Sequence, residues 1–176
     1  MTTQKIPVLE TERLILRGHT AQDFPACGEM WSDPDVMRFL GGAPLSEEDA
    51  WAKLLRIAGH WAINGFGFWS VHEKATGKRI GETGWLAVKR IITPSLEGIP
   101  EAGWAFAKEA QGKGYASEAV TAVHAWGEER FGKVKYCCII APENAPSLRL
   151  AGRMGYHPIA ETTYKNEPIV VLHRDP

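Results

Sequence analysis

The chain has 176 residues, of which 44% are hydrophobic and 23% are charged. A chain of this length buries roughly two-thirds of its unfolded surface, so it can form a core without disulfides or a structural metal. Its 20 Lys and Arg residues nearly balance 21 Asp and Glu residues. This balance argues against a protein that coats nucleic acid or an anionic membrane, because both need a broad excess of positive charge.

The cysteines and the N-terminal segment indicate a cytoplasmic protein. Cys27, Cys137 and Cys138 are odd in number, and the adjacent pair lies in an apolar run, so buried and unpaired thiols are expected. The first residues, MTTQKIPVLETERL, lack the apolar stretch of a signal peptide, and no membrane span is predicted. No His and Cys cluster has metal-ligand spacing, so no metal is expected.

The first half of the chain predicts one strand, two main helices and a hairpin. ERLILR forms the strand, and a helix follows over 23–31. Ser46 begins a longer helix, because it opens a capping-box-like sequence that precedes apolar residues at helical spacing. From Gly67 the period changes to two, so FWSVHE and RIGETGWLAV flank a turn at 75–78 and predict an antiparallel hairpin.

The second half alternates between strands and helices. The expected elements are a strand at 101–107, a helix at 116–131, a strand at 134–141, a short helix ending at Met154, and strands at 156–160 and 169–173. Neither repeats nor a linker divide the chain, so residues 1–176 are expected to form one domain. This order after a hairpin predicts a mixed α/β sheet in three layers.

The most informative segment, EAGWAFAKEAQGKGYA, joins the strand 101–107 to the helix 116–131. Its glycines let backbone N–H groups approach a ligand, and the helix start offers unpaired donors, which together suit a phosphate or diphosphate. Lys113 precedes Gly114 and Tyr115, so the Ser or Thr of a P-loop is missing, and the third glycine of a dinucleotide fingerprint is missing too. An ordinary strand-to-helix turn remains the alternative.

QGKGYA resembles the acetyl-CoA pyrophosphate loop of the GCN5-related N-acetyltransferases (GNAT), whose pattern is Gln/Arg-x-x-Gly-x-Gly/Ala. Further segments agree in order along essentially the whole chain: ETERLILR, WSDPDVMRFLGG, IGETGW, EAGWAF, NAPS and RMGY. The chain is most similar to the branch of the ribosomal-protein N-terminal acetyltransferases. The resemblance implies an α/β GNAT fold in a single domain. Its mixed, mostly antiparallel central sheet is flanked by helices, and a splayed pair of parallel strands admits the cofactor.

The resemblance also implies acetyl-CoA as the donor and a set of residues that bind it. Backbone N–H groups of the loop would bind the diphosphate, and the pantetheine would insert between the strands 104–107 and 134–141. The implied cofactor-binding residues are Trp104, Phe106, Ala107, Gln111, Gly112, Lys113, Gly114, Tyr115, Ala116, Asn144 and Ser147.

The implied reaction is direct attack of an amine on the thioester, which needs a base for the amine and an acid for the thiolate. Many members use a Tyr as the acid where this chain has Ala151, so Ser147 is the expected replacement, with helix capping as its alternative role. Glu82 and Glu101, on neighbouring strands, are the expected bases. Solvated strand-end residues are the alternative for both, and His60, His72 and His173 are weaker candidates.

The acceptor is expected to be a protein N-terminal α-amine or a small amine. An α-amine costs about 1 kcal/mol to deprotonate at pH 7, against about 4.6 for a lysine, so a weak base suits it better. Trp31, Trp51 and Trp61 lie where the family builds its acceptor wall. No nucleic acid or membrane partner is expected, and a homodimer is left open. The second hypothesis is a non-catalytic acyl-CoA-binding module of the same fold.

Overall fold

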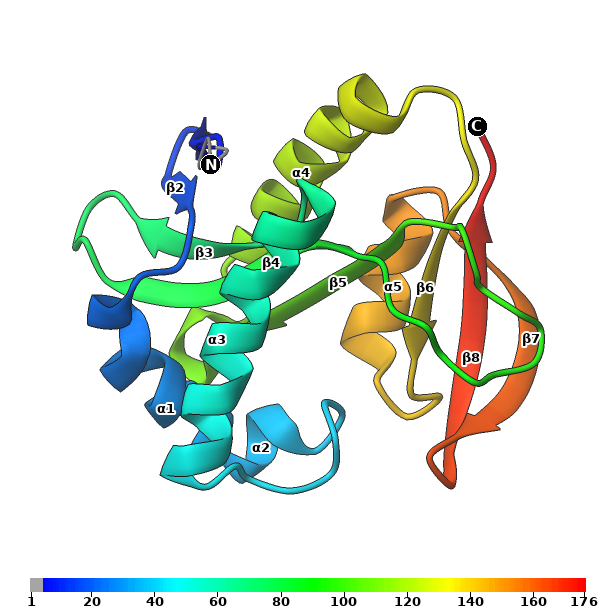
Figure 1. The fold of residues 1–176 in the computed structure, drawn as a ribbon, viewed down its shortest axis with the longest axis horizontal. Coiled ribbons are helices and arrows are strands. Elements are labelled where there is room, and N and C mark those ends of the chain that lie inside the picture. The colour runs from blue at the N-terminus through cyan, green and yellow to red at the C-terminus, as the bar shows by residue number, and fades with distance from the viewer. Residues whose placement is uncertain (1–4) are drawn as a thin grey trace. The chain divides into compact units, whose positions relative to one another are not determined.

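The computed structural model describes residues 5–176 and confirms a mixed α/β fold. The strands are hydrogen-bonded in the order β1-β2-β3-β4-β5-β6-β8-β7 (Figure 1). β5 and β6 are parallel, whereas the β1-β2, β2-β3, β3-β4, β6-β8 and β7-β8 pairs are antiparallel. The elements in chain order are β1 (Leu9–Glu10), β2 (Leu14–Arg17), η1 (Ala21–Asp23), α1 (Phe24–Ser32), α2 (Pro34–Met37), α3 (Glu47–Asn64), β3 (Phe68–Glu73), β4 (Arg79–Leu86), β5 (Glu101–Phe106), η2 (Lys108–Ala110), α4 (Tyr115–Phe131), β6 (Tyr136–Ile140), α5 (Ala145–Arg153), β7 (His157–Tyr164) and β8 (Glu167–Arg174).

The chain divides into two compact units. The first contains the residues up to Gly84 together with Trp104–Ala125, and the second contains Trp85–Gly103 and Trp126–Pro176. Residues 1–4, the start of the N-terminal segment MTTQKIPVLETERL, lie outside the described residues. Within residues 5–176, no helix has both the length and the apolar character that a bilayer crossing demands.

In the first unit, α1 and α2 pack with α3 around an apolar cluster (Figure 1). The start of α3 is as predicted, because the Ser46 hydroxyl accepts a hydrogen bond from the Asp49 N–H at 3.1 Å. Gly65 ends the helix in a left-handed conformation with φ of 71°. The cluster consists of Cys27, Met30, Trp31, Val36, Met37, Ala50, Leu54, Ile57 and Ala105.

The predicted hairpin is also present in this unit, as β3 and β4. Ser70 lies opposite Glu82, and Phe68 opposite Gly84. A Cβ atom at Gly84 would lie 2.1 Å from the Gly67 carbonyl oxygen, so only glycine allows the strands to approach this closely. Glu82 lies two residues before Gly84 in β4 and so shares its face of the sheet. The Glu82 side chain is buried in the interior of the unit.

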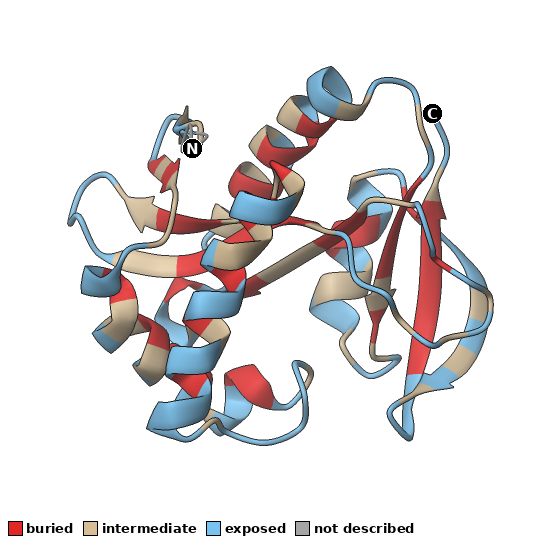
Figure 2. Cartoon of the chain, viewed as in Figure 1, coloured by how far each residue is buried: buried red, intermediate tan, exposed pale blue. Residues whose placement is uncertain are grey.

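In the second unit, β6 and β8 are mostly buried, and β7 lies beyond them at the sheet edge (Figure 2). Cys137 and Cys138 are buried free thiols, as is Cys27 in the first unit, which confirms the prediction for all three. The last two strands are longer than predicted. The residues Lys165 and Asn166 both have positive φ and form the tight turn that joins them.

Candidate active site

The strand-to-helix segment of the first unit forms an exposed glycine loop. Gly112 and Gly114 have φ of 74° and 81°, a conformation that side-chain-bearing residues rarely adopt. The first helical hydrogen bond of α4 runs from the Glu118 N–H to the Gly114 oxygen, at 3.1 Å. The N–H groups just before Glu118 are therefore the unpaired donors of the α4 N-terminus. The loop thus combines accessible backbone with the positive end of a 17-residue helix.

The two ends of this loop are tied to neighbouring backbone and side chains. The Gln111 side chain donates to the Phe106 oxygen at 3.1 Å, and Ala107 donates its N–H to the Ile80 oxygen at 2.9 Å. Phe106 is buried, whereas Trp104 and Ala107 are half-buried. At the other end, the Tyr115 hydroxyl donates to Glu73, which raises the pKa of Tyr115. The loop is therefore exposed but anchored on both sides.

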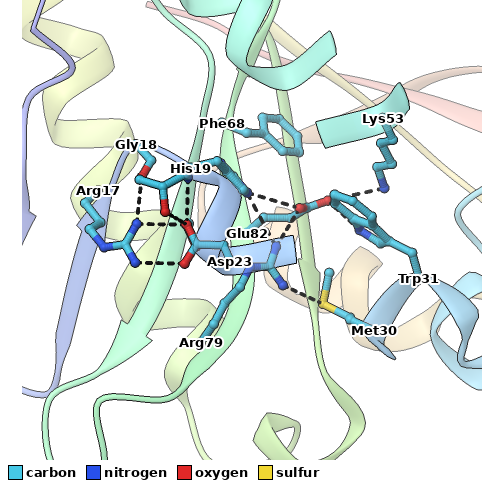
Figure 3. A network of polar contacts seen from close by, with 12 residues as sticks. Arg17, Gly18, His19, Asp23, Met30, Trp31, Lys53, Phe68, Arg79 and Glu82 are labelled. Atoms are coloured by element: carbon cyan, nitrogen blue, oxygen red, sulfur yellow. Dashed lines mark hydrogen bonds and ion pairs between the residues drawn. The ribbon is translucent and has the colours of Figure 1, made fainter. Parts of the chain in front are cut away.

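Glu82 is the centre of a buried polar network in the first unit, and its side chain is 1% exposed (Figure 3). Its Oε1 atom accepts from the Trp31 indole N–H at 3.2 Å and lies 3.3 Å from the Lys53 Nζ. Its Oε2 atom accepts from Arg79 at 2.8 Å and lies 3.5 Å from the His19 Nε2. Lys53 also stands over the Trp31 ring, 4.3 Å from its centre. Both carboxylate oxygens are thus fully occupied.

These contacts decide the ionisation of Glu82. Burial alone would raise the pKa of its carboxyl, but Lys53, His19 and Arg79 outweigh burial and hold the pKa well below its usual value. A carboxylate with a low pKa and four neighbouring donors is a weak proton acceptor. The arrangement therefore suits a fixed negative charge that orients Lys53, Arg79 and Trp31.

Glu101 occupies a comparable position in the second unit. Arg90 binds its carboxylate in a two-pronged ion pair, with both N···O distances at 2.7 Å. The Arg90 guanidinium also lies over the Tyr164 ring, 4.8 Å from its centre. Glu101 is buried and lies opposite Cys137 where β5 and β6 pair. Neither carboxylate is a solvated strand end, which removes that alternative for both.

The residues expected near the thioester lie at the start of α5 in the second unit. The Asn144 side chain caps this helix by accepting the Ser147 N–H at 3.3 Å. Because Asn144 supplies the cap, the Ser147 hydroxyl is not needed for that purpose. Ser147 itself is half-buried.

A GNAT acetyltransferase domain model matches residues 13–157 of the chain. The uncharacterized protein YkkB of Bacillus subtilis (strain 168) is 31% identical over 94% of this chain and 94% of its own length. A solved Bordetella pertussis protein assigned to the GnaT acetyltransferase family is 32% identical, with a TM-score of 0.85 over 96% of this chain and 99% of that chain. The chain belongs to the GNAT family of acetyltransferases.

A further solved structure shares the fold at lower identity. It is RimL, a ribosomal L7/L12 alpha-N-protein acetyltransferase in complex with coenzyme A. RimL is 13% identical to this chain, with a TM-score of 0.77 over 96% of this chain and 98% of its own. RimL thus supports the predicted fold class, and the family model with the two relatives above 30% identity confirms the predicted family, so the chain is an N-acetyltransferase by family.

Ala151, which the sequence resemblance places where many GNAT members carry a Tyr, is fully buried on α5. Tyr156 is buried as well, and burial raises the pKa of its hydroxyl well above the usual value. It is therefore packed in the interior. Of the tryptophans proposed for the acceptor wall, Trp31 and Trp61 are buried, and Trp51 is 40% exposed with its ring edge-on to Phe24.

Several residues of these networks were not predicted from the sequence. Lys53 and His19 reach Glu82 from distant segments, and Arg90 reaches Glu101 from an irregular loop. Arg79 is only three residues before Glu82, so their closeness in the sequence could have suggested an ion pair. Strand periodicity, however, predicts that residues three apart lie on opposite faces. The irregular register next to His72, which pairs with Arg79, brings them together. Among residues 5–176, no three His, Cys, Asp or Glu side chains gather closely enough to hold a metal ion.

Proposed function

We propose that this GNAT protein transfers the acetyl group of acetyl-CoA to a primary amine. The observation that carries the proposal is the exposed glycine loop, in which Gly112 and Gly114 have positive φ immediately before α4. Backbone N–H groups from Gly112 to Ala116 would bind the diphosphate, at about 1.5 to 3 kcal/mol for each bond to a charged group, whereas the Gln111 N–H donates to the Lys108 oxygen. Such binding needs no excess of basic side chains, which agrees with the nearly neutral charge of the chain.

In the proposed reaction the amine nitrogen attacks the acetyl carbonyl carbon, the carbon–sulfur bond breaks, and coenzyme A leaves as a thiolate. The nitrogen loses one proton and the thiolate gains one, and no covalent enzyme intermediate forms. Ser147 would stabilise the leaving thiolate through its hydroxyl. Asn144, which fixes the backbone at Ser147, would lie near the thioester.

The proposed acceptor is an α-amine, either a protein N-terminus or a small molecule. Glu82 and Glu101, the bases expected from the sequence, are both held by cationic side chains, so the amine proton would pass to a water instead of directly to either carboxylate. A weak base suffices for an α-amine, whose deprotonation at pH 7 costs about 1 kcal/mol. The alpha-N-protein acetyltransferase activity named for RimL supports this class of acceptor.

The second candidate function is that of a non-catalytic acyl-CoA-binding module. It is favoured by one observation, namely that Ala151 stands fully buried where many family members carry the catalytic Tyr. For either function a reducing compartment such as the cytoplasm suits the three free thiols of the chain.

The test has two steps. Acetyl-CoA should raise the melting temperature by mass action, and ATP at the same concentration should not. No shift with acetyl-CoA would overturn both candidate functions. Release of coenzyme A is then measured with peptides that have free N-termini, with amino acids and with polyamines. Turnover with an α-amine supports the enzyme, whereas binding without turnover of any acceptor leaves the non-catalytic module.

A further inference from the structure

Arg13, which precedes β2, joins the N-terminal region to the glycine loop of the same unit. Its Nε donates to Glu118 Oε2 at 2.7 Å, and its Nη1 donates to the Lys113 carbonyl oxygen at 2.9 Å. Its guanidinium also lies over the Tyr115 ring, 4.5 Å from the centre. One side chain therefore contacts the loop, the first residue of α4 and the first turn of that helix.

Glu118 holds the guanidinium in this position. Its Oε1 atom accepts from the Arg13 backbone N–H at 2.8 Å and from the Thr11 hydroxyl at 2.5 Å. Burial alone would raise the pKa of the Glu118 carboxyl, but the hydrogen bonds from Thr11 and Arg13 outweigh burial and keep the pKa below its usual value. Glu118 is therefore ionised at neutral pH, in the helix turn where a negative charge is most favourable.

The bond to Lys113 fixes the orientation of a peptide group. The Lys113–Gly114 peptide is trans, so its carbonyl and the Gly114 N–H point in opposite directions. A carbonyl held by Arg13 directs the Gly114 N–H away from Arg13. Glycine tolerates both signs of φ, so this peptide could otherwise rotate. A Cβ atom at Gly114 would lie 3.3 Å from Arg13 Nη2, so the guanidinium also packs closely against the glycine.

We propose that Arg13, supported by Glu118, is a positioning residue that holds the Gly114 N–H in the direction needed to bind the diphosphate of the acyl donor. This inference rests on the proposed function, because it takes the glycine loop as the diphosphate site. Arg13 acts on the ligand through the loop backbone. A direct charge contact between Arg13 and the diphosphate is the competing explanation.

The affinity for coenzyme A is measured by calorimetry for three proteins: wild type, Arg13→Ala and Glu118→Gln. Arg13→Ala should weaken binding about tenfold, which corresponds to about 1.4 kcal/mol. Glu118→Gln separates the two explanations, because it removes the support of Arg13 while making the site more positive. Weaker binding by Glu118→Gln is expected, and tighter binding would overturn the positioning role in favour of direct charge.

Kinetics with two donors exclude a general structural effect. S-acetylpantetheine carries the same thioester as acetyl-CoA but lacks the diphosphate. Arg13→Ala should lower kcat/KM for acetyl-CoA about tenfold and leave kcat/KM for S-acetylpantetheine unchanged. Equal losses with both donors would overturn the inference. Arg174→Ala, which removes the surface ion pair with Glu128 in the other unit, is the matched control and should change neither value.

Two further measurements keep the test decisive. If Arg13→Ala does not fold, Arg13→Lys replaces it, because an ammonium keeps the charge but cannot span both Glu118 and the Lys113 carbonyl. Without ligand, the Gly114 amide should show millisecond exchange by NMR in the variant and not in wild type, and no difference would overturn the inference. If wild type itself does not bind coenzyme A, the proposed function fails, whereas equal binding by wild type and variants defeats only the role of Arg13.

Discussion

Arg79 Nη2 lies 2.8 Å from Glu82 Oε2, and the two side chains are 3% and 1% exposed. Lys53, 18% exposed, adds a second cation at the same carboxylate. Separating charges from water is costly, and the cost is offset here only because each charge has a partner. Glu82 therefore neutralises two cations that would otherwise stand unpaired within the first unit.

Replacing Glu82 by Gln should destabilise the protein strongly. The amide keeps the shape of the side chain but leaves Arg79 and Lys53 without a counter-charge, so we expect a loss of about 3 to 5 kcal/mol in the free energy of unfolding. Urea unfolding measures the change. Glu97→Gln is the control, because the Glu97 pair with Lys89 is 3.8 Å long and exposed, and it should change stability by less than about 1 kcal/mol. Equal stabilities of the two variants would contradict the central role of Glu82.

The same network predicts how stability depends on pH. The folded pKa of Glu82 lies below the ordinary value of 4.5, so the unfolded chain binds the proton more readily. The stabilisation is complete above about pH 4.5 and is lost as the pH falls toward the folded pKa. Asp23, whose pKa is lowered by Arg17 against the effect of burial, acts in the same direction.

Melting temperatures between pH 6 and pH 2.5 check this dependence. Wild type should lose stability steeply below about pH 4.5, whereas Glu82→Gln should start lower and fall less steeply, because its amide cannot take up the proton. Parallel curves for the two proteins would show that Glu82 does not contribute to the acid transition.

Local signals account for what could be predicted from the sequence. Ser46 caps α3, two-residue alternation marks β3 and β4, and the glycines stand where positive φ is needed, since each depends on neighbouring residues alone. The two-residue strand β1 was missed because so short a segment has no period.

The partners of the buried carboxylates were missed for another reason. Lys53, His19 and Arg90 meet Glu82 and Glu101 only through tertiary structure, so sequence spacing could not reveal that both acids are neutralised.

The glycine loop can be tested with two glycines of matched geometry. Gly112 and Gly77 have φ of 74° and 69°, and an added Cβ at either would meet no atom within 4 Å. Gly112→Ala and Gly77→Ala should therefore each lower the free energy of unfolding by about 1 to 2 kcal/mol, because alanine is strained at a positive φ. Only Gly112→Ala should also weaken coenzyme A binding, by about tenfold or 1.4 kcal/mol, because Gly77 lies in the β3-β4 turn. Calorimetry measures the affinity of both variants for coenzyme A, and equal affinities would show that Gly112 is not part of the diphosphate site.

Ser147 can be separated from Asn144 because the cap hydrogen bond of α5 joins the Asn144 side chain to the Ser147 backbone. Ser147→Ala should preserve the cap hydrogen bond, because that bond uses the Ser147 backbone N–H. Asn144→Ala should lower stability by about 1 kcal/mol through loss of that cap.

If the Ser147 hydroxyl stabilises the leaving thiolate, its removal should lower kcat about 100-fold while the affinity for coenzyme A changes little. Ser32→Ala, on an exposed part of α1, is the control for both readings. An unchanged kcat in Ser147→Ala would leave the departing thiolate to solvent, and a fall in kcat matched by a fall in melting temperature would assign Ser147 to the helix instead of the reaction.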